Sequence, residues 1–416
     1  MRVVQFTDTL GDVNGVSRFI QNVAHQANET GRELHVVTST GFPVPEWDNI
    51  HNVKPVFTTK MPKYEQLELA IPSLPGLLGL ARRLRPDVIH LSTPGTVGMV
   101  GWLAAKRLRI PILGVYHTDF PAYIDHLFDD GAFTWLTTWF MRRFYAPFSA
   151  IFTRSEDYAG SLVRLGMSRD TLVRLLPGIE TGRFQPSFRD PGIWESLEAE
   201  EREEQRGVSE EGVRVLYVGR VSVEKNMPLL ERIWGEVSRR CAGQGLSASL
   251  IVVGDGPYKK HMQEELAGRG VHFLGFRHGE ELSTIYASAD LFVFPSTTDT
   301  LGQVVMESQS SGLPVLVTDE GGPKEVVEDG ATGYVLDPED TSAWVDRIVE
   351  LVADEAARRA MGDAAHRAMQ EFDIRNSFEH YWQVHERVWR EHGAGGGRGA
   401  AAGGRDATGP ALRESA

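Results

Sequence analysis

Residues 294–325 read FPSTTDTLGQVVMESQSSGLPVLVTDEGGPKE, and this stretch indicates the fold class. It follows a short apolar run at 291–294 (LFVF), passes through a Ser/Thr-rich loop, continues as a predicted helix over 303–311, and reaches a second apolar run at 314–317 (PVLV). Strands that are apolar at nearly every position are buried on both faces. The stretch therefore predicts a strand–loop–helix–strand unit of a parallel sheet covered by helices.

The same alternation extends through the chain in two halves. Strands are predicted in the first half at 2–6, 34–38, 87–91, 111–116 and 150–154, and in the second half at 213–218, 248–253, 271–274, 291–294 and 314–317. The predicted helices lie at 16–30, 96–108, 226–240, 256–268, 280–288, 303–311, 322–328 and 341–371. Each half is therefore predicted to be a doubly wound α/β domain, in which ligands bind beyond the carboxyl ends of the strands.

The domain boundaries follow from composition. We expect a first Rossmann-like domain over 1–183 and a second over 184–371, because the join near 176–186 (LPGIETGRFQP) is rich in Pro and Gly. A C-terminal helix is predicted over 372–392, packing back on the first domain, and the Gly-rich tail 393–416 is predicted to be disordered.

The loop and the helix start within 299–307 carry the strongest functional signal. The N–H groups at a helix start near Gly302 are unpaired and lie at the positive end of the helix dipole, which suits a phosphate or sugar oxygen. Asp299 lies in the loop and Glu307 on the helix, so one carboxylate can bind a sugar hydroxyl and the other a ribose diol. Alone, Asp299 could be a helix cap and Glu307 a surface charge, but the combination favours a ligand site.

A second motif, 218–226 (VGRVSVEKN), directly follows another predicted strand. Gly219 permits a tight turn, and Arg220 and Lys225 place two cations at the strand end, where they can neutralise a pyrophosphate. Alone, such a pair is typical of exposed charges. Its place ahead of the carboxylate block favours a phosphate site. The turn at 254–257 (GDGP) is interpreted as structural, because it lacks the full dinucleotide-binding pattern.

These motifs resemble those of the retaining glycosyltransferases of family 4, whose fold is called GT-B. The family pattern E-x-F-G-x₄-E corresponds here to Asp299, Leu301, Gly302 and Glu307, followed by S-G-x-P-V. Asp for the first Glu and Leu for Phe resemble a lipid-directed subgroup, the GDP-mannose-dependent mannosyltransferases and sulfoquinovosyl-lipid synthases. The resemblance covers about 1–390 and implies two Rossmann-like domains facing each other across a cleft.

The resemblance also implies the site residues. Those expected to act in catalysis are His117, Asp119, Arg220, Lys225 and Asp299. Those expected to bind the donor are Gly15, Gly219, Phe276, Arg277, Leu301, Gly302, Gln303 and Glu307. Two alternatives stay open, because a His after a strand is often structural and the segment 274–277 is also compatible with a plain strand-to-loop turn.

The activity implied by the resemblance is transfer of a hexose, with mannose favoured, from a nucleotide diphosphate sugar to a lipid or glycan hydroxyl with retention of configuration. The first domain would bind the acceptor and the second the nucleotide sugar. Because two cations are present and no D-x-D pair is found, we expect a metal-independent reaction without a cofactor besides the GDP-sugar or UDP-sugar donor. The alternatives are a UDP-sugar-dependent glycolipid synthase, a nucleotide-sugar epimerase on the same fold, and a non-catalytic sugar-binding or scaffold protein.

Charge and composition restrict partners and location. With 43 basic and 57 acidic side chains, the chain lacks the basic footprint of a nucleic-acid-binding protein. The single cysteine, the lack of a signal peptide and the lack of a membrane-spanning run predict a cytoplasmic protein. The segment 132–148 (AFTWLTTWFMRRFYAPF) has two interpretations, a core helix ending in Arg142 and Arg143, or a peripheral contact with the inner face of the membrane.

Overall fold

The computed structural model describes residues 1–12, 15–61, 64–117, 131–201, 212–299 and 301–395. The chain divides into two compact units, and each is described by itself. The first comprises Met1–Phe152, Val163–Val173 and the chain from Trp382 onwards, and the second comprises Thr153–Leu162 and Arg174–Tyr381. Helix α14 (Ile374–Gly395) therefore begins in the second unit and ends in the first.

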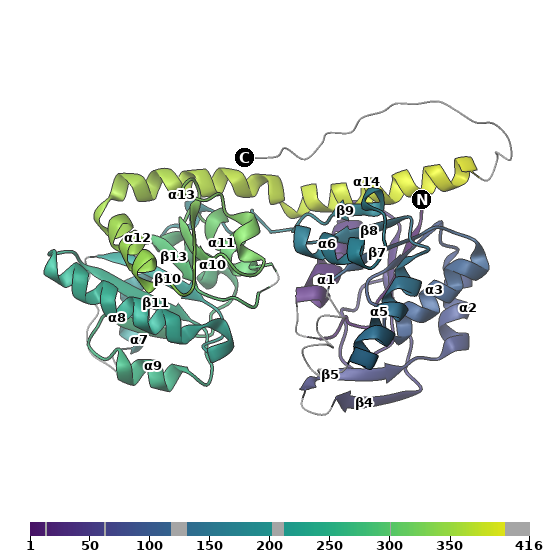
Figure 1. The fold of residues 1–416 in the computed structure, drawn as a ribbon, viewed down its shortest axis with the longest axis horizontal. Coiled ribbons are helices and arrows are strands. Elements are labelled where there is room, and N and C mark those ends of the chain that lie inside the picture. The colour runs from purple at the N-terminus through teal and green to yellow at the C-terminus, as the bar shows by residue number, and fades with distance from the viewer. Residues whose placement is uncertain (13–14, 62–63, 118–130, 202–211, 300, 396–416) are drawn as a thin grey trace. The chain divides into compact units, whose positions relative to one another are not determined.

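The first unit is built on a seven-stranded sheet with the order β3-β2-β1-β6-β7-β8-β9. These strands are β1 (Val3–Phe6), β2 (Leu34–Thr38), β3 (Ile50–Asn52), β6 (Val88–Leu91), β7 (Ile112–Tyr116), β8 (Ala150–Thr153) and β9 (Leu172–Arg174). The helices between β1 and β9 are α1 (Gly15–Glu29), α2 (Leu74–Leu84), α3 (Thr96–Leu108), α5 (Gly131–Tyr145) and α6 (Glu156–Arg164), and most of α6 belongs to the second unit. An antiparallel hairpin of β4 (Phe57–Met61) and β5 (Tyr64–Ile71) lies outside the sheet, as Figure 1 shows.

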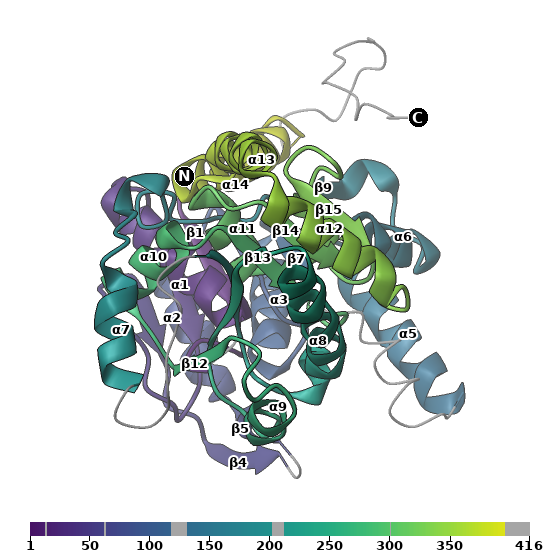
Figure 2. The ribbon, with the colours of Figure 1, turned by 90° about the vertical axis from the view of Figure 1, so that its left-hand side faces the viewer.

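The second unit is built on a six-stranded sheet with the order β12-β11-β10-β13-β14-β15, and every pair in it is parallel. Its strands are β10 (Val213–Val218), β11 (Ala248–Val253), β12 (Val271–Gly275), β13 (Leu291–Phe294), β14 (Val315–Thr318) and β15 (Gly333–Leu336). Its helices include α7 (Ile193–Glu201), α8 (Met227–Gly243), α9 (Lys259–Glu265), α10 (Gly279–Ser288), α11 (Gln303–Ser310), α12 (Thr341–Ala353) and α13 (Glu355–Met369). Figure 2 shows α7 and α10 on one side of the sheet, and α8 and α12 on the other.

The core of the second unit follows from the apolar strands. The last four residues of β10 and of β11 are all buried. Trp234 of α8 and Trp344 of α12 are fully buried against this sheet. Each indole N–H donates to a backbone carbonyl, that of Arg269 at 2.9 Å and that of Asp337 at 3.0 Å, so neither polar group is buried without a partner. Cys241 is buried in the same core.

Most predicted elements are present, and several observed ones have no predicted counterpart, among them β3, β9, α2 and α6. The predicted helix over 341–371 is interrupted at Asp354, whose side chain accepts a hydrogen bond from Ala357 N at 2.9 Å and caps α13. The segment predicted as a helix at 322–328 forms only a short 3₁₀ turn, η4 (Pro323–Val326). The hairpin and β15 were not predicted. No helix within the described ranges is long and apolar enough to cross a bilayer.

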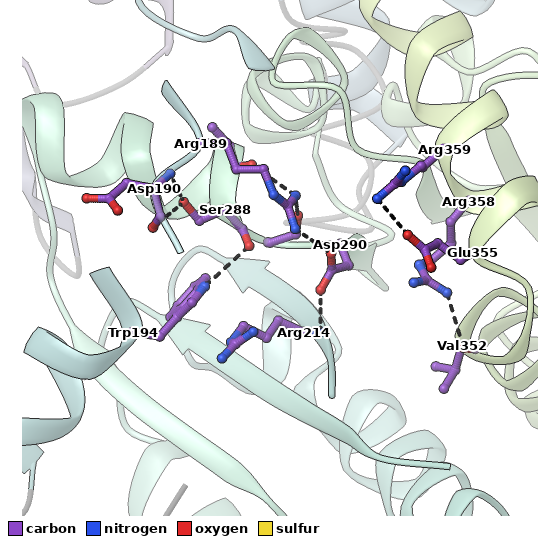
Figure 3. A network of polar contacts seen from close by, with 12 residues as sticks. Arg189, Asp190, Trp194, Arg214, Ser288, Asp290, Val352, Glu355, Arg358 and Arg359 are labelled. Carbon is purple, nitrogen blue, oxygen red and sulfur yellow. Dashed lines mark hydrogen bonds and ion pairs between the residues drawn. The ribbon is translucent and has the colours of Figure 1, made fainter. Parts of the chain in front are cut away.

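A polar network holds the segment before α7 to the second unit (Figure 3). Ser288 Oγ accepts from Asp190 N at 2.9 Å and donates to Asp190 O at 3.0 Å. Trp194 Nε1 donates to Ser288 O at 3.3 Å, and Arg189 pairs with Asp290 at 3.0 Å. Because Ser288 and Asp290 precede β13, this network lies at the amino ends of the parallel strands.

Candidate functional site

Two loops leave the carboxyl ends of β10 and β13, which are neighbours in the second sheet. The cation loop, 219–226, follows β10, and the carboxylate loop, 295–302, follows β13. The connections of the sheet reverse direction between these two strands, which is where doubly wound sheets bind ligands. The described residues of both loops therefore form the candidate site.

An ion pair joins the two loops. Lys225 Nζ donates to Asp299 Oδ2 at 2.8 Å, and the two side chains are 22% and 25% exposed. Thr298 Oγ1 forms a second link by donating to Glu224 O at 3.1 Å. Because the ion pair is partly shielded from water, its attraction is screened less than that of a fully exposed pair. The predicted residues Lys225 and Asp299 are thus brought together.

Two buried hydroxyl groups form hydrogen bonds with these two loops. Ser296, which is fully buried, donates from Oγ to Asp299 Oδ2 at 2.5 Å. Tyr217, also fully buried, donates from its hydroxyl to Arg220 O at 2.9 Å and so holds the backbone of the cation loop. Burial raises the pKa of Tyr217 well above its ordinary value, and the negative charge of Asp299 raises it further. Tyr217 therefore stays a neutral donor beneath the site.

Arg220 lies in the same loop but outside the Lys225–Asp299 pair. Its guanidinium pairs with Glu224 at 3.0 Å, and these two side chains are 54% and 56% exposed. Exposed pairs of this kind contribute little stability. The guanidinium can therefore leave Glu224 for an anionic ligand at small cost.

Glycines let the cation loop lie directly on the neighbouring turn at 254–257. A Cβ on Gly254 would lie 2.0 Å from Gly219 O, and a Cβ on Gly256 would lie 2.3 Å from Val221 O. Val221 N donates to Asp255 O at 3.0 Å. The turn thus supports the cation loop through its backbone, as the structural interpretation of its sequence predicted.

Helix α11 begins at the end of the carboxylate loop with a glycine at the cap position. Gly302 has a left-handed backbone with φ of 68°, and a Cβ there would lie 2.8 Å from Pro323 Cγ. Glycine has no side chain to cap the first N–H groups of the helix. Leu301 packs against the hydrophobic core and Gln303 is partly buried. Because Gly302 holds the cap position, the interpretation of Asp299 as the helix cap is wrong.

Glu307 lies further along α11 and is only 4% exposed. Its Oε2 accepts a hydrogen bond at 3.1 Å from the hydroxyl of Tyr286, which is fully buried on α10. The interpretation of Glu307 as a surface charge is therefore wrong.

Phe276 and Arg277 follow β12 at the same edge of the sheet. The ring of Phe276 is 69% exposed and lies nearly parallel to that of His278, with centroids 6.5 Å apart. Arg277 donates from Nε to Leu274 O at 3.0 Å and pairs with Glu281 at 2.8 Å. The carboxyl end of β12 is tied to the turn at 254–257, because Gly254 N donates to the carbonyl of its last residue at 2.7 Å.

The remaining predicted residues lie in the first unit. Gly15 begins α1, and His117 directly follows β7. The ring of Phe19, one turn into α1, contacts that of His117 edge-on, with centroids 5.9 Å apart. The start of α1 and His117 are therefore close together. Asp119 lies outside the described residues.

In the first sheet, the carboxylate of Asp8 lies beyond the carboxyl ends of β1 and β6, at the start of α3. Asp8 Oδ1 accepts from Val97 N at 2.7 Å and from Thr96 Oγ1 at 3.0 Å. Asp8 Oδ2 accepts from Thr93 Oγ1 at 2.6 Å and from Gly98 N at 3.2 Å. The first N–H groups of α3 are thus satisfied within the protein.

Sequence analysis missed three residues that shape these sites, Asp8, Tyr217 and Ser296. Ser296 precedes Asp299 by three residues, a spacing at which a hydroxyl reaches a local acceptor, so a local signal existed. Asp8 gave no such signal, because its partners lie 85 or more residues away. Among the described residues, no cluster of three or more His, Cys, Asp or Glu is arranged to hold a metal. Metal independence stays a prediction.

Comparison with known proteins covers both halves of the chain. Residues 13–183 match the family described as Glycosyltransferase Family 4, and residues 198–368 match the family described as Glycosyl transferases group 1. The chain is 31% identical over 370 residues to sulfoquinovosyl transferase SQD2 of Arabidopsis thaliana, covering 87% of this chain and 68% of that protein. It is 31% identical over 336 residues to a GDP-mannose-dependent alpha-mannosyltransferase of Mycobacterium tuberculosis, covering 79% and 81%.

A solved structure shows a similar fold. The sucrose-phosphate synthase from Thermosynechococcus elongatus matches 94% of this chain and 100% of its own, with a TM-score of 0.71 and 18% identity. At this identity the likeness concerns the fold alone.

Proposed function

This chain belongs to glycosyltransferase family 4 and has the GT-B fold of two Rossmann-like domains, and on that premise we propose that it is a retaining, metal-independent hexosyltransferase. The predicted resemblance and fold class are confirmed. The observation that carries the proposal is the Lys225–Asp299 pair, which joins the loop after β10 to the loop that leads from β13 into α11.

The proposed donor site binds the diphosphate of a nucleotide sugar. Lys225, Arg220 and the N–H groups at the start of α11 neutralise the diphosphate as it departs with a growing negative charge. Groups that are already oriented toward developing charge stabilise a transition state strongly. Two cations in place of a bound metal support a metal-independent reaction, without a cofactor besides the donor.

The sugar lies next to the diphosphate in this proposal. Asp299 accepts a hydrogen bond from a donor-sugar hydroxyl, and Glu307 binds the ribose after exchanging its contact with Tyr286. In the retaining reaction, the acceptor oxygen bonds to the anomeric carbon on the face that the diphosphate leaves. The bond from that carbon to the phosphate oxygen breaks, and the departing phosphate takes the acceptor proton. The family resemblance adds His117 and Asp119 to the residues expected to act in catalysis, and their roles stay predictions.

We favour GDP-mannose as the donor. The name of the Mycobacterium tuberculosis relative supports this choice, while the T-D-T-L-G motif at 298–302 fits both the mannosyltransferases and the sulfoquinovosyl-lipid synthases. The backbone of Phe276 and Arg277 would contact the base, and backbone contacts of this kind do not separate guanine from uracil. A UDP-sugar is therefore the alternative donor. In this assignment the second domain holds the donor and the first domain holds the acceptor.

The acceptor proposed is a hydroxyl of a lipid or glycan, and α5 supports a lipid surface. Trp135, Leu136 and Trp139 are 67%, 51% and 51% exposed, and Arg142 and Arg143 are exposed at the end of the same helix. These positions fall on one helical face, which combines apolar side chains with cations. Such a face suits peripheral contact with an anionic membrane.

The test is a transfer assay with purified full-length protein. GDP-mannose and UDP-glucose are each offered with a lipid extract in the presence of excess chelator, and the anomeric configuration of the product is read by NMR. The proposal expects a glycosylated product from GDP-mannose, retention, and no loss of rate with chelator. Donor turnover without a glycosylated product would instead identify an epimerase or a hydrolase, and activity restored only by Mn²⁺ would refute metal independence.

A further inference from the structure

We infer that Ser296 is a positioning residue that anchors one oxygen of Asp299, so that the other oxygen faces the donor sugar. This inference rests on the proposed function, because it concerns the same donor site.

The two oxygens of the Asp299 carboxylate have different surroundings. Oδ2 accepts hydrogen bonds both from Ser296 Oγ, at 2.5 Å, and from Lys225 Nζ, at 2.8 Å. The side-chain hydrogen bonds that Asp299 accepts from other described residues both end on Oδ2. The side chain is 25% exposed, so a ligand can reach it. A carboxylate held by one oxygen and open at the other is arranged to accept a hydroxyl.

The two anchors of Oδ2 differ in rigidity. Ser296 is fully buried directly after β13, and its carbonyl accepts a hydrogen bond from Thr318 Oγ1 at 3.0 Å. Its Oγ therefore has a fixed position. Lys225 reaches Asp299 on a flexible four-carbon stem and carries a charge that a diphosphate attracts. When the diphosphate draws Lys225 away, Ser296 remains as the anchor.

One anchor is enough to orient the carboxylate of Asp299, because its side chain has only two torsions. Fixing Oδ2 and the backbone leaves the direction of Oδ1 nearly determined. Without the Ser296 hydroxyl, the carboxylate can rotate whenever Lys225 turns to the diphosphate. The consequence is confined to steps in which the sugar is held, because the diphosphate contacts do not involve Ser296.

The chain offers a matched control at the other end of the same strand. Ser288 precedes β13 by three residues and is 1% exposed, and its hydroxyl has two polar contacts, both with the backbone of Asp190 (Figure 3). Replacing Ser288 by Ala removes an equally buried hydroxyl from the edge of the sheet opposite the site. Any general effect of losing a buried hydroxyl is therefore measured by this variant.

The experiment compares Ser296→Ala, Ser296→Thr and Ser288→Ala with the unmodified chain. Calorimetry gives the Kd for GDP and for UDP, and steady-state assays with GDP-mannose and with UDP-glucose give kcat and KM. Since a hydrogen bond to a charged group contributes about tenfold in an equilibrium, we expect Ser296→Ala to lower kcat about tenfold while the Kd for the nucleoside diphosphate changes less than about twofold. Ser296→Thr, which keeps the hydroxyl, should restore most of the rate, and Ser288→Ala should keep the original kcat.

Three results would overturn the inference. The first is a Ser296→Ala variant with unchanged kcat. The second is a parallel loss of nucleoside diphosphate binding and rate, which would mean that Ser296 only supports the loop. The third is a Ser296→Thr variant as slow as Ser296→Ala. If the unmodified chain transfers no sugar from either donor, the proposed function itself fails, which is a distinguishable outcome because it appears before any substitution is compared.

Discussion

The two sheets share the order of their first four strands, and in each a helix follows the fourth strand, yet the two helix starts are occupied differently. In the first unit, Asp8 accepts hydrogen bonds from the first N–H groups of α3. In the second unit, α11 starts at Gly302, which has no side chain, and Lys225 lies on the adjoining loop against Asp299.

The same strand order can therefore place either a stabilising contact or a binding site at the start of the following helix. A carboxylate at a helix start compensates the helix dipole and removes the charge that would attract an anion. A glycine at the same place leaves the N–H groups for a ligand, and a neighbouring lysine adds positive charge. Of the two places where the connections of a sheet reverse direction, between β1 and β6 and between β10 and β13, the second is therefore the one suited to a diphosphate.

The largest effect is expected for Lys225→Ala. Removing one preorganised charge-stabilising group lowers the rate by about 10²–10³-fold, and we expect this loss in kcat/KM. Lys259→Ala is the control, because Lys259 also pairs with a carboxylate of the second unit and its side chain is 26% exposed, close to the 22% of Lys225. A rate for Lys225→Ala equal to that of Lys259→Ala would remove Lys225 from the donor site.

Asp8→Ala tests the contact between Asp8 and the start of α3, and we expect it to lower the stability of the folded chain. Asp8 accepts four hydrogen bonds, two of them from backbone N–H groups in the first turn of α3, and their loss should lower the free energy of unfolding by about 2–3 kcal/mol in urea titrations. Asp354→Ala is the control, since it removes a single cap bond and should cost about 1 kcal/mol. Equal losses in the two variants would contradict the structural role given to Asp8.

Gly302→Ala tests whether the glycine start of α11 matters for binding. A left-handed backbone is strained for alanine by about 1–2 kcal/mol, and the added Cβ also meets Pro323. We expect the free variant to relieve this strain by shifting the start of α11, and the strain restored on binding should weaken the Kd for the nucleoside diphosphate about tenfold by calorimetry. Gly330→Ala carries the same strain, with φ of 75° and no atom within 4 Å of the added Cβ, and should leave the Kd unchanged.

The smallest effect concerns pH and should have opposite signs in the two units. Burial, helped by the charges of His385 and His117, holds the pKa of His90 in β6 well below 6.5. The folded first unit therefore keeps His90 neutral, and its stability falls as the pH drops below 6.5, by at most about 1.4 kcal/mol per pH unit for one proton. In urea titrations between pH 8 and pH 5, His90→Gln should weaken this dependence, and the part due to His35 and His51, whose pKa values burial also lowers, should remain.

Glu325 of the second unit should behave in the opposite way. Burial raises its pKa to about 7, against the opposing charge of Arg174. The folded form then holds a proton that the unfolded form loses above about 4.5, so this contribution to stability is present at low pH and disappears as the pH rises through 7. Glu325→Gln should flatten that part of the profile. If the free energy of unfolding changed with pH between about 4.5 and 7 in the same way in Glu325→Gln and in the unmodified chain, the pKa assigned to Glu325 would be contradicted.

The parts of the site that can be predicted from the sequence are those whose residues lie close together in the chain, within a single loop each. Gly219, Arg220 and Lys225 lie in one contiguous block, and Asp299 and Gly302 in another, so strand ends and turn residues locate them. The alternation of apolar strands and helices predicts both sheets for the same reason, because each signal is local.

The parts that sequence analysis missed depend on contacts across the fold or on burial. Asp8 reaches α3 through the pairing of β1 with β6, and Glu307 is buried where Tyr286 of α10 lies beside it. The break at Asp354 had a local signal, an aspartate three residues before Ala357, but the surrounding helix-favouring residues obscured it. Pairing and burial of this kind cannot be derived from periodicity alone.

The central claim is that a nucleoside diphosphate binds at the carboxyl edge of the second sheet. A crystal structure of the chain soaked with GDP or UDP tests it most directly. The account predicts diphosphate oxygens within about 3.2 Å of Lys225 Nζ and of backbone N–H groups at the start of α11. A diphosphate found at the start of α3, or one that leaves Lys225 paired with Asp299 and out of reach, would contradict it.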